Sequence, residues 1–139
     1  MISLISHTDF SLKTKEAYKN LISNVIKAEG FLISEVCVVF FNDSQLQKLN
    51  LQYLKHDSFT DVVTFDYSDN QQVAGDICVS VERVSQNAKS FGVSFSQELA
   101  RVITHGVLHL CGYKDKTLIQ KNEIRIKEDL YLERFFLNS

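Results

Sequence analysis

The residues of this sequence with the clearest capacity for chemistry lie between positions 104 and 115. His105 and His109 are four residues apart, so a helix places both imidazoles on one face, about 6 Å apart along its axis. Gly112 follows, and glycine often ends a helix because it adopts a left-handed conformation at little steric cost. The chain can then reverse and bring Asp115 back toward the histidines. Two imidazole nitrogens and one carboxylate oxygen, with a fourth position open, predict a catalytic site for one Zn2+ or another divalent transition metal.

The spacing matches a known class of zinc peptidases. The metzincin pattern H-x-x-x-H-x-x-G-x-x-[H/D] is met at its ligand and turn positions, but Gly106 stands where those peptidases carry their general-base glutamate. A chance pair of histidines, one packed in the core and one solvated, is the alternative. Imidazoles buried on an otherwise apolar helix need partners, which favours the metal site.

The composition is typical of one globular domain. The 139 residues, with 45% hydrophobic and 23% charged, are enough for a single core, so we expect one domain over residues 1–139. The first apolar residues form too short a run for a signal peptide, and no stretch is expected to span a membrane. A net charge of −2 argues against binding nucleic acid by charge alone, although a metal ion and a local basic rim can dominate one cleft.

The three cysteines predict the compartment. Cys37, Cys78 and Cys111 are far apart and form no C-x-x-C pair, which is typical of reduced thiols in a cytoplasmic protein. Cys111 lies about 200° round the helix from His109 and is expected to pack away from the metal.

Hydrophobic periodicity predicts the element order β-α-β-α-β-β-α-α-α. Ser94 and Thr117, each followed three residues later by glutamine, form capping boxes for the helix with the histidines and for the last helix. The predicted fold is α+β, with a four-stranded mixed sheet, two early helices crossing one face and a zincin-like metal-binding helix packed on the sheet. Strands are expected at 2–6, 36–41 (covered on both faces), 61–67 and 73–81. Helices are expected from a cap at Ser11 or Asp9 to about 29, and at about 44–54 (capped by Asp43), 81–91, 95–111 and 117–136.

Four segments in order carry motifs of one family. Residues 49–53 look like L-N-x-x-Y, 60–65 like T-D-V-L-S-F, 75–80 like G-D-I-x-I-S, and 105–113 match H-G-x-L-H-L-x-G-Y. With Glu98-Leu99, they resemble the YbeY family of metal-dependent endoribonucleases, the rRNA maturation factors. The resemblance implies a single-strand-specific endoribonuclease that matures the 16S rRNA 3′ end, serves ribosome quality control and associates with RNA and the small ribosomal subunit. Neither a membrane nor a nucleotide cofactor is implied.

Two positions depart from the family pattern. The family usually reads G-Y-D-H, and this chain has Asp115 where the third histidine stands. A carboxylate can replace that ligand, but an anion makes the metal a weaker Lewis acid and its water less acidic. The family also usually carries an arginine where this chain has Leu54, so its substrate contact is either lost or taken over by Lys55 or His56.

Other side chains are candidates around the metal. Lys114 and Lys116 flank Asp115 and could contact phosphates, or they could be solvated lysines on a loop. Asp61 could accept a hydrogen bond from a ligating histidine or cap a turn. Glu98 is expected to be a charge at a helix start. No residue is assigned as general acid or base.

Hydrolysis of RNA explains how the site could work without a glutamate base. A metal can acidify water and hold a phosphoryl oxygen, an alkoxide leaves more readily than an amine, and the 2′-hydroxyl could itself be the nucleophile. The alternatives are a zinc metallopeptidase, disfavoured by Gly106, and a non-catalytic ribosome-assembly factor with structural zinc. Structural zinc usually has four protein ligands, and three are visible here.

Overall fold

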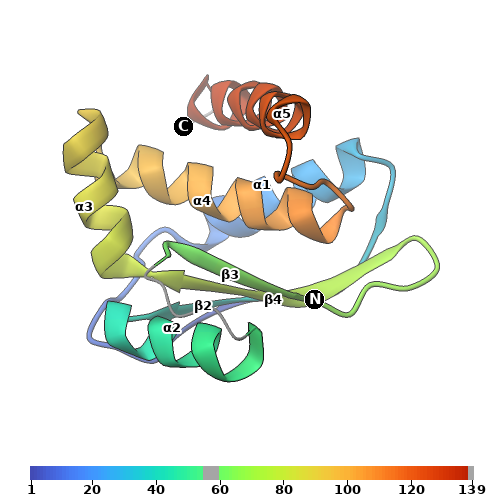
Figure 1. Ribbon diagram of the computed structural model, residues 1–139. Coiled ribbons are helices and arrows are strands. Elements are labelled where there is room, and N and C mark those ends of the chain that lie inside the picture. Colours follow the sequence, from blue (N-terminus) through green and yellow to red (C-terminus); the bar gives the residue numbers. More distant parts are fainter. Residues whose placement is uncertain (55–59, 138–139) are drawn as a thin grey trace.

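The protein is described here by a computed structural model, which covers residues 1–54 and 60–137 and contains a four-stranded sheet with helices on both faces (Figure 1). The strands are β1 (Ile2–Ser6), β2 (Leu32–Phe41), β3 (Val62–Asp66) and β4 (Gln72–Ser80). Their spatial order is β1-β2-β4-β3, with β2 parallel to both β1 and β4, and β3 antiparallel to β4. The predicted α+β class with a mixed four-stranded sheet is therefore confirmed.

Helices lie on both sides of this sheet. Four of them, α1 (Lys15–Ala28), α3 (Val81–Phe91), α4 (Phe95–Leu110) and α5 (Leu118–Leu137), share one side, with α5 outermost (Figure 1). The short α2 (Asp43–Leu49) and the π-helical turn that follows it (Asn50–Leu54) come next after β2, and α2 lies on the opposite side. The expectation that both early helices cross one face is therefore wrong. The strand that follows α2 is β3, which runs antiparallel to its neighbour, so the handedness rule for parallel crossovers does not place α2.

The apolar run in β2 divides its side chains between two cores. Val36, Val38 and Phe40 are buried in the main core with residues of α1 and α4. Val39 and Phe41 point the other way and pack in a smaller cluster that includes a buried leucine of α2. Alternate side chains of a strand point to opposite faces, so the prediction that this strand is covered on both faces is confirmed.

Helix α4 is fixed firmly between the sheet and the outer helices. Its predicted capping box is present, because the Gln97 backbone N–H donates to Ser94 Oγ and the Ser94 N–H donates to Gln97 Oε1. Gly106 faces the sheet, and a Cβ added there would lie 2.7 Å from Cγ2 of Ile77 and 3.4 Å from Cγ2 of Thr64. A side chain at position 106 would therefore meet the sheet, so packing closes the position at which a peptidase carries its glutamate.

Element boundaries differ from the predicted ones where tertiary contacts decide them. The first helix begins at Lys15, not near Asp9 or Ser11, and β2 begins at Leu32 because that residue already pairs with β4. Helix α2 is capped by Asn42 instead of Asp43, whose carboxylate lies 2.7 Å from Nη2 of Arg83. In the described parts of the chain, no helix combines the length and the apolar character needed to cross a membrane.

Candidate metal centre

Three side chains converge beside the C-terminal end of α4. His105 Nε2 lies 2.9 Å from His109 Nε2, and Asp115 Oδ2 lies 3.1 Å from the first nitrogen and 3.3 Å from the second. Four ligands bound tetrahedrally to zinc at about 2.0–2.2 Å lie about 3.3 Å from one another. A small outward movement of the three atoms would therefore accommodate an ion. The three predicted ligands are thus brought together, with their candidate atoms all within 4.8 Å.

In both histidines the outer ring nitrogen, Nδ1, is hydrogen-bonded to the protein, which leaves the inner nitrogen, Nε2, facing the site. His105 Nδ1 lies 2.6 Å from Glu128 Oε2, and His109 Nδ1 lies 2.8 Å from the carbonyl oxygen of Tyr113. A carboxylate and a carbonyl only accept hydrogen bonds, so each Nδ1 carries a proton, and Nε2 of each ring is the nitrogen that can bind a metal. Two lone pairs facing one another and a carboxylate oxygen repel unless a proton or a metal ion lies among them. This set of donor atoms fits a metal ion.

The turn after α4 positions both His109 and Asp115. Gly112 has a positive φ of 103°, the N–H of Tyr113 donates to the Leu108 carbonyl, and the N–H of Gly112 donates to the His109 carbonyl. These two bonds form the Schellman motif that closes many helices. The same turn directs the Tyr113 carbonyl at His109 Nδ1. The predicted reversal of the chain at Gly112 is confirmed, and it returns Asp115 to the two imidazoles.

A buried carboxylate of α1's C-terminal end anchors this turn from behind. Glu29 accepts hydrogen bonds from the hydroxyls of Tyr113 (2.7 Å) and Tyr131, and Lys127 Nζ lies 3.2 Å away. Burial raises the pKa of Glu29, but hydrogen bonds from Tyr131, Tyr113 and Lys127 and the charge of that lysine together hold it below its usual value. Glu29 therefore joins α1, the turn and α5 through its charged form.

Glu29→Gln is expected to lower the free energy of unfolding by about 2 kcal/mol at neutral pH, because hydrogen bonds to a charged acceptor are lost. The folded-state pKa of Glu29 lies below the usual glutamate value, so the advantage of the native carboxylate is complete above that usual value and is lost as pH falls through the folded-state pKa. Urea unfolding from pH 3 to pH 7 measures the difference. The exposed Glu16→Gln is the matched control. A difference that does not change with pH would contradict this role of Glu29.

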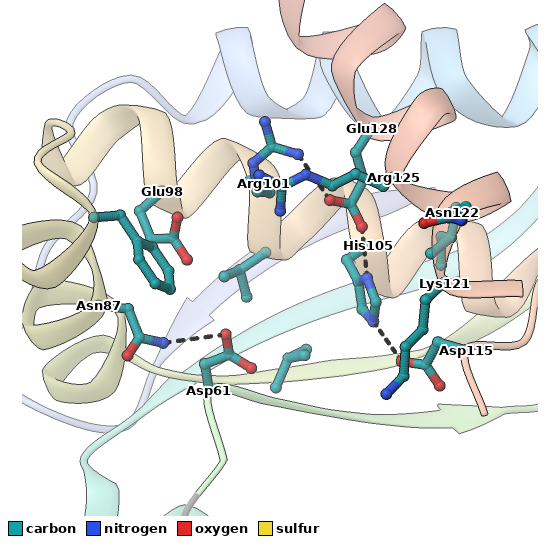
Figure 2. Close-up of a pocket in the computed structure, with 14 residues that line it drawn as sticks. Asp61, Asn87, Glu98, Arg101, His105, Asp115, Lys121, Asn122, Arg125 and Glu128 are labelled. Atoms are coloured by element: carbon teal, nitrogen blue, oxygen red, sulfur yellow. Dashed lines mark hydrogen bonds and ion pairs between the residues drawn. The ribbon is translucent and has the colours of Figure 1, made fainter. Parts of the chain in front are cut away.

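Glu128, on α5, was not predicted, and it orients His105. Glu128 is only 4% exposed, and Arg101 Nη1 lies 2.9 Å from its second oxygen (Figure 2). Nη2 of the same arginine lies 2.8 Å from Asp129. Burial lowers the pKa of His105, but the hydrogen bond and charge of Glu128, together with the charges of Asp115 and Asp61, raise that pKa above its usual value. Glu128 therefore holds the ring and its tautomer in place.

A signal for Glu128 was present in the sequence. Glu128 falls within the apolar stripe of α5: it lies four residues after Ile124, three before Tyr131 and four before Leu132. A carboxylate in such a stripe is buried against a neighbouring element and needs a partner. Asp61, expected either to accept from a ligating histidine or to cap a turn, accepts from the side-chain amide of Asn87 at 3.5 Å.

Two hollows open beside the metal centre. The first, which we call the α4 cleft, has a volume of about 470 Å³ and extends from His105 and Asp115 along α4 to α3 (Figure 2). The second, of about 360 Å³, lies toward β3 and is lined by Leu54, among others. Leu54, at the position where the family usually carries an arginine, therefore faces the metal centre in this chain.

The predicted phosphate-binding residues do not line these hollows. Lys114 and Lys116 are exposed on either side of Asp115, and neither borders the two cavities. Lys121 of α5, which was not predicted, lines the α4 cleft (Figure 2). The predictions at Lys55 and His56 fall outside the described residues.

A helix with two inward-facing imidazoles, a left-handed turn and a returning carboxylate, packed on a mixed sheet, defines a zincin-like metal-dependent hydrolase. Residues 4–136 match the family model for Endoribonuclease YbeY. The chain belongs to the YbeY endoribonuclease family, as the sequence motifs predicted. The predicted reaction class, cleavage of RNA, is thereby confirmed over the peptidase and the non-catalytic alternatives.

Relatives support this membership along the whole chain. Endoribonuclease YbeY of Flavobacterium johnsoniae is 45% identical over 135 residues, covering 97% of both chains. The protein of the same name from Chlorobium limicola is 35% identical over 130 residues, covering 91% of this chain and 90% of the relative. The solution structure of a protein from Thermotoga maritima has a TM-score of 0.72 at 31% identity, and covers 99% of this chain and 91% of that one.

Proposed function

We propose that this chain is a zinc-dependent endoribonuclease that cuts single-stranded rRNA, with His105, His109 and Asp115 holding one Zn2+. The observation that carries the proposal is the convergence of three donor atoms within 4.8 Å, with the outer nitrogen of each imidazole already engaged. Family membership supplies the reaction class, since the relatives are named endoribonucleases. Two imidazole nitrogens suit zinc and neighbouring transition metals better than magnesium or calcium.

The residues of the chain prepare the site for the reaction. When bound, the metal supplies Lewis acidity toward phosphoryl oxygens and makes water a better nucleophile at neutral pH. Glu128 and the Tyr113 carbonyl hold the two imidazoles with their lone pairs inward. Lys121, on the wall of the α4 cleft, adds positive charge where a phosphodiester would enter. Lys114 and Lys116 stay predicted contacts to phosphates further along the RNA.

The open coordination position distinguishes this proposal from structural zinc. In residues 1–54 and 60–137, the group of possible ligands has three members, and hollows border it on two sides. Catalytic zinc has three protein ligands and an exchangeable fourth position, whereas structural zinc is closed by four. The arrangement therefore favours a metal that meets substrate.

The proposed partner is rRNA at the small ribosomal subunit, and the proposed compartment is the cytoplasm. Cys37, Cys78 and Cys111 are free thiols, which persist in a reducing compartment. Burial raises the pKa of Cys78 and Cys111 to about 12, so neither is poised to react. Cys111 also packs against the main core, as predicted from its helix position.

Removal of the metal by a chelator tests the proposal. We expect cleavage of a single-stranded RNA oligonucleotide to stop and the far-ultraviolet circular dichroism to stay unchanged, because the sheet and α4 have their own buried core. Added Zn2+ should restore cleavage. Global unfolding on chelation would instead indicate structural zinc, and undiminished cleavage would rule out a metal-dependent reaction.

A further inference from the structure

The α4 cleft contains a buried carboxylate that the metal centre does not use. Glu98 is 5% exposed and lines this cleft, and Figure 2 shows its carboxylate turned into it, on the side where Asp61 lies. It precedes His105 by seven residues, which is about 10 Å along the helix. Glu98 lies in the first turn of α4, as expected for a charge at a helix start, and it is also buried there.

No protein group neutralises this carboxylate by direct contact. Among the residues that the structure describes, none donates a hydrogen bond to the Glu98 side chain or forms an ion pair with it. The adjacent Arg101 is already bonded to Glu128 and Asp129. Burial raises the pKa of Glu98 and the negative charge of Asp61 raises it further, while the positive charges of Arg101 and Arg125 lower it without cancelling the rise. The Glu98 oxygens face the cleft without a bonded protein partner in the described residues, so a molecule that brings hydrogen-bond donors into the cleft would stabilise the charged form.

The surroundings restrict what that molecule is. Within residues 1–54 and 60–137, Glu98 forms no metal-binding group with Asp61 or Glu128, since their ligand atoms do not gather as those of the metal centre do. The cleft volume of about 470 Å³ falls in the range of small-molecule sites, roughly 300–1,000 Å³. The occupant is therefore of organic size and rich in donors.

The cleft has the chemistry of a base-binding site. Guanine is the RNA base with two adjacent donors, N1–H and the N2 amino group, that one carboxylate can accept together. Its O6 lies beside them and can accept from an amide such as that of Asn87, which lines the cleft. Phe91, 65% exposed at the cleft, offers a ring on which a base can stack. Adenine, cytosine and uracil do not present two donors side by side.

We propose that the α4 cleft binds a guanine of the RNA substrate near the cut bond, with Glu98 accepting from N1–H and N2–H, Asn87 donating to O6 and Phe91 stacking on the base. Lys121 and Arg125 on the α5 wall place positive charge where the backbone phosphates of that nucleotide would run (Figure 2). The proposal rests on the proposed function, because it names a sequence preference of the same site.

Matched oligonucleotides test this base preference. Uridine oligonucleotides that contain a single guanosine, inosine or adenosine are compared for kcat/KM, and fully 2′-deoxy versions are compared for Kd by fluorescence anisotropy. Loss of a bidentate contact weakens recognition of a base by about 10–100-fold. We therefore expect kcat/KM and affinity to be higher by that factor for the guanosine oligonucleotide than for the adenosine one. Inosine, which lacks the N2 amino group, should lie in between. In Glu98→Gln the ratio of guanosine to adenosine should fall to near one, because an amide N–H then faces N1–H.

Controls separate this proposal from the proposed function. The exposed Glu123→Gln carries the same charge change and should keep the guanosine preference. Zinc content and melting temperature of Glu98→Gln should not fall, since no bonded partner is lost. Metal-dependent cleavage with equal kcat/KM and Kd for all three oligonucleotides would overturn the guanine site and leave the nuclease intact. If no RNA is cleaved, the proposed function fails, and the Kd values of the deoxy oligonucleotides still decide the base preference.

Discussion

His105→Ala or His109→Ala is expected to remove most of the bound metal and nearly all RNA cleavage, and to leave a folded protein. Each histidine supplies one of the three donor atoms, and the two Nε2 atoms lie 2.9 Å apart. Changing a residue that only supports a metal ligand lowers metal affinity about 10–100-fold, so loss of a ligand itself should lower it by at least about 100-fold. Elemental analysis of the purified variants and cleavage of a single-stranded RNA measure the two effects.

The two variants should differ in stability. His105→Ala leaves the buried Glu128 with Arg101 as its remaining bonded partner, whereas His109→Ala frees only the Tyr113 carbonyl at a turn. We therefore expect a larger fall in melting temperature for His105→Ala. The exposed His7→Ala is the control for both. Full metal occupancy in either variant would show that the replaced histidine is not a ligand.

Asp115→Ala is expected to lower metal affinity by a similar factor, at least about 100-fold, because the only anionic donor of the group is removed. Asp115→His should restore binding through an imidazole, as in the pattern usual for the family. Asp115→Asn tests charge separately, since its amide oxygen keeps nearly the same shape. Metal content and affinity, measured by competition with a chromophoric chelator, give the order of the three variants.

The pH optimum of cleavage should also change in Asp115→His. With a neutral third ligand the ion keeps more positive charge, which makes its water more acidic and shifts the pH optimum of kcat/KM downward. The exposed Asp9→Ala serves as the control. A native metal affinity in Asp115→Ala would mean that water or another residue completes the centre, and Asp115 would then be no ligand.

The metal centre could be predicted from sequence because its geometry is local. A helix turn sets the distance between His105 and His109, and the Schellman turn at Gly112 returns Asp115 within three residues. The side chains around it could not be placed in the same way. Glu128 and Lys121 come from α5, and their positions depend on how that helix packs over α4.

The fold shows the same division between local and distant information. Capping residues and alternating apolar positions identified the elements and their order. The face covered by α2 depended on β3 joining the far edge of the sheet, which no periodicity reports. The environment of Glu98 likewise depended on α3, β3 and α5 closing a cleft over α4. Its position in the first turn of a helix indicated only a favourable charge.

A titration of metal-free protein with Zn2+ tests the central assignment most directly, with bound zinc and the rate of RNA cleavage measured on the same samples. We predict that the rate rises with bound zinc and levels off at one equivalent, and that His109→Ala and Asp115→Ala show no such rise over the same range. Full cleavage without metal, or a normal rise in a variant that lacks one of these side chains, would contradict a catalytic metal held by His105, His109 and Asp115.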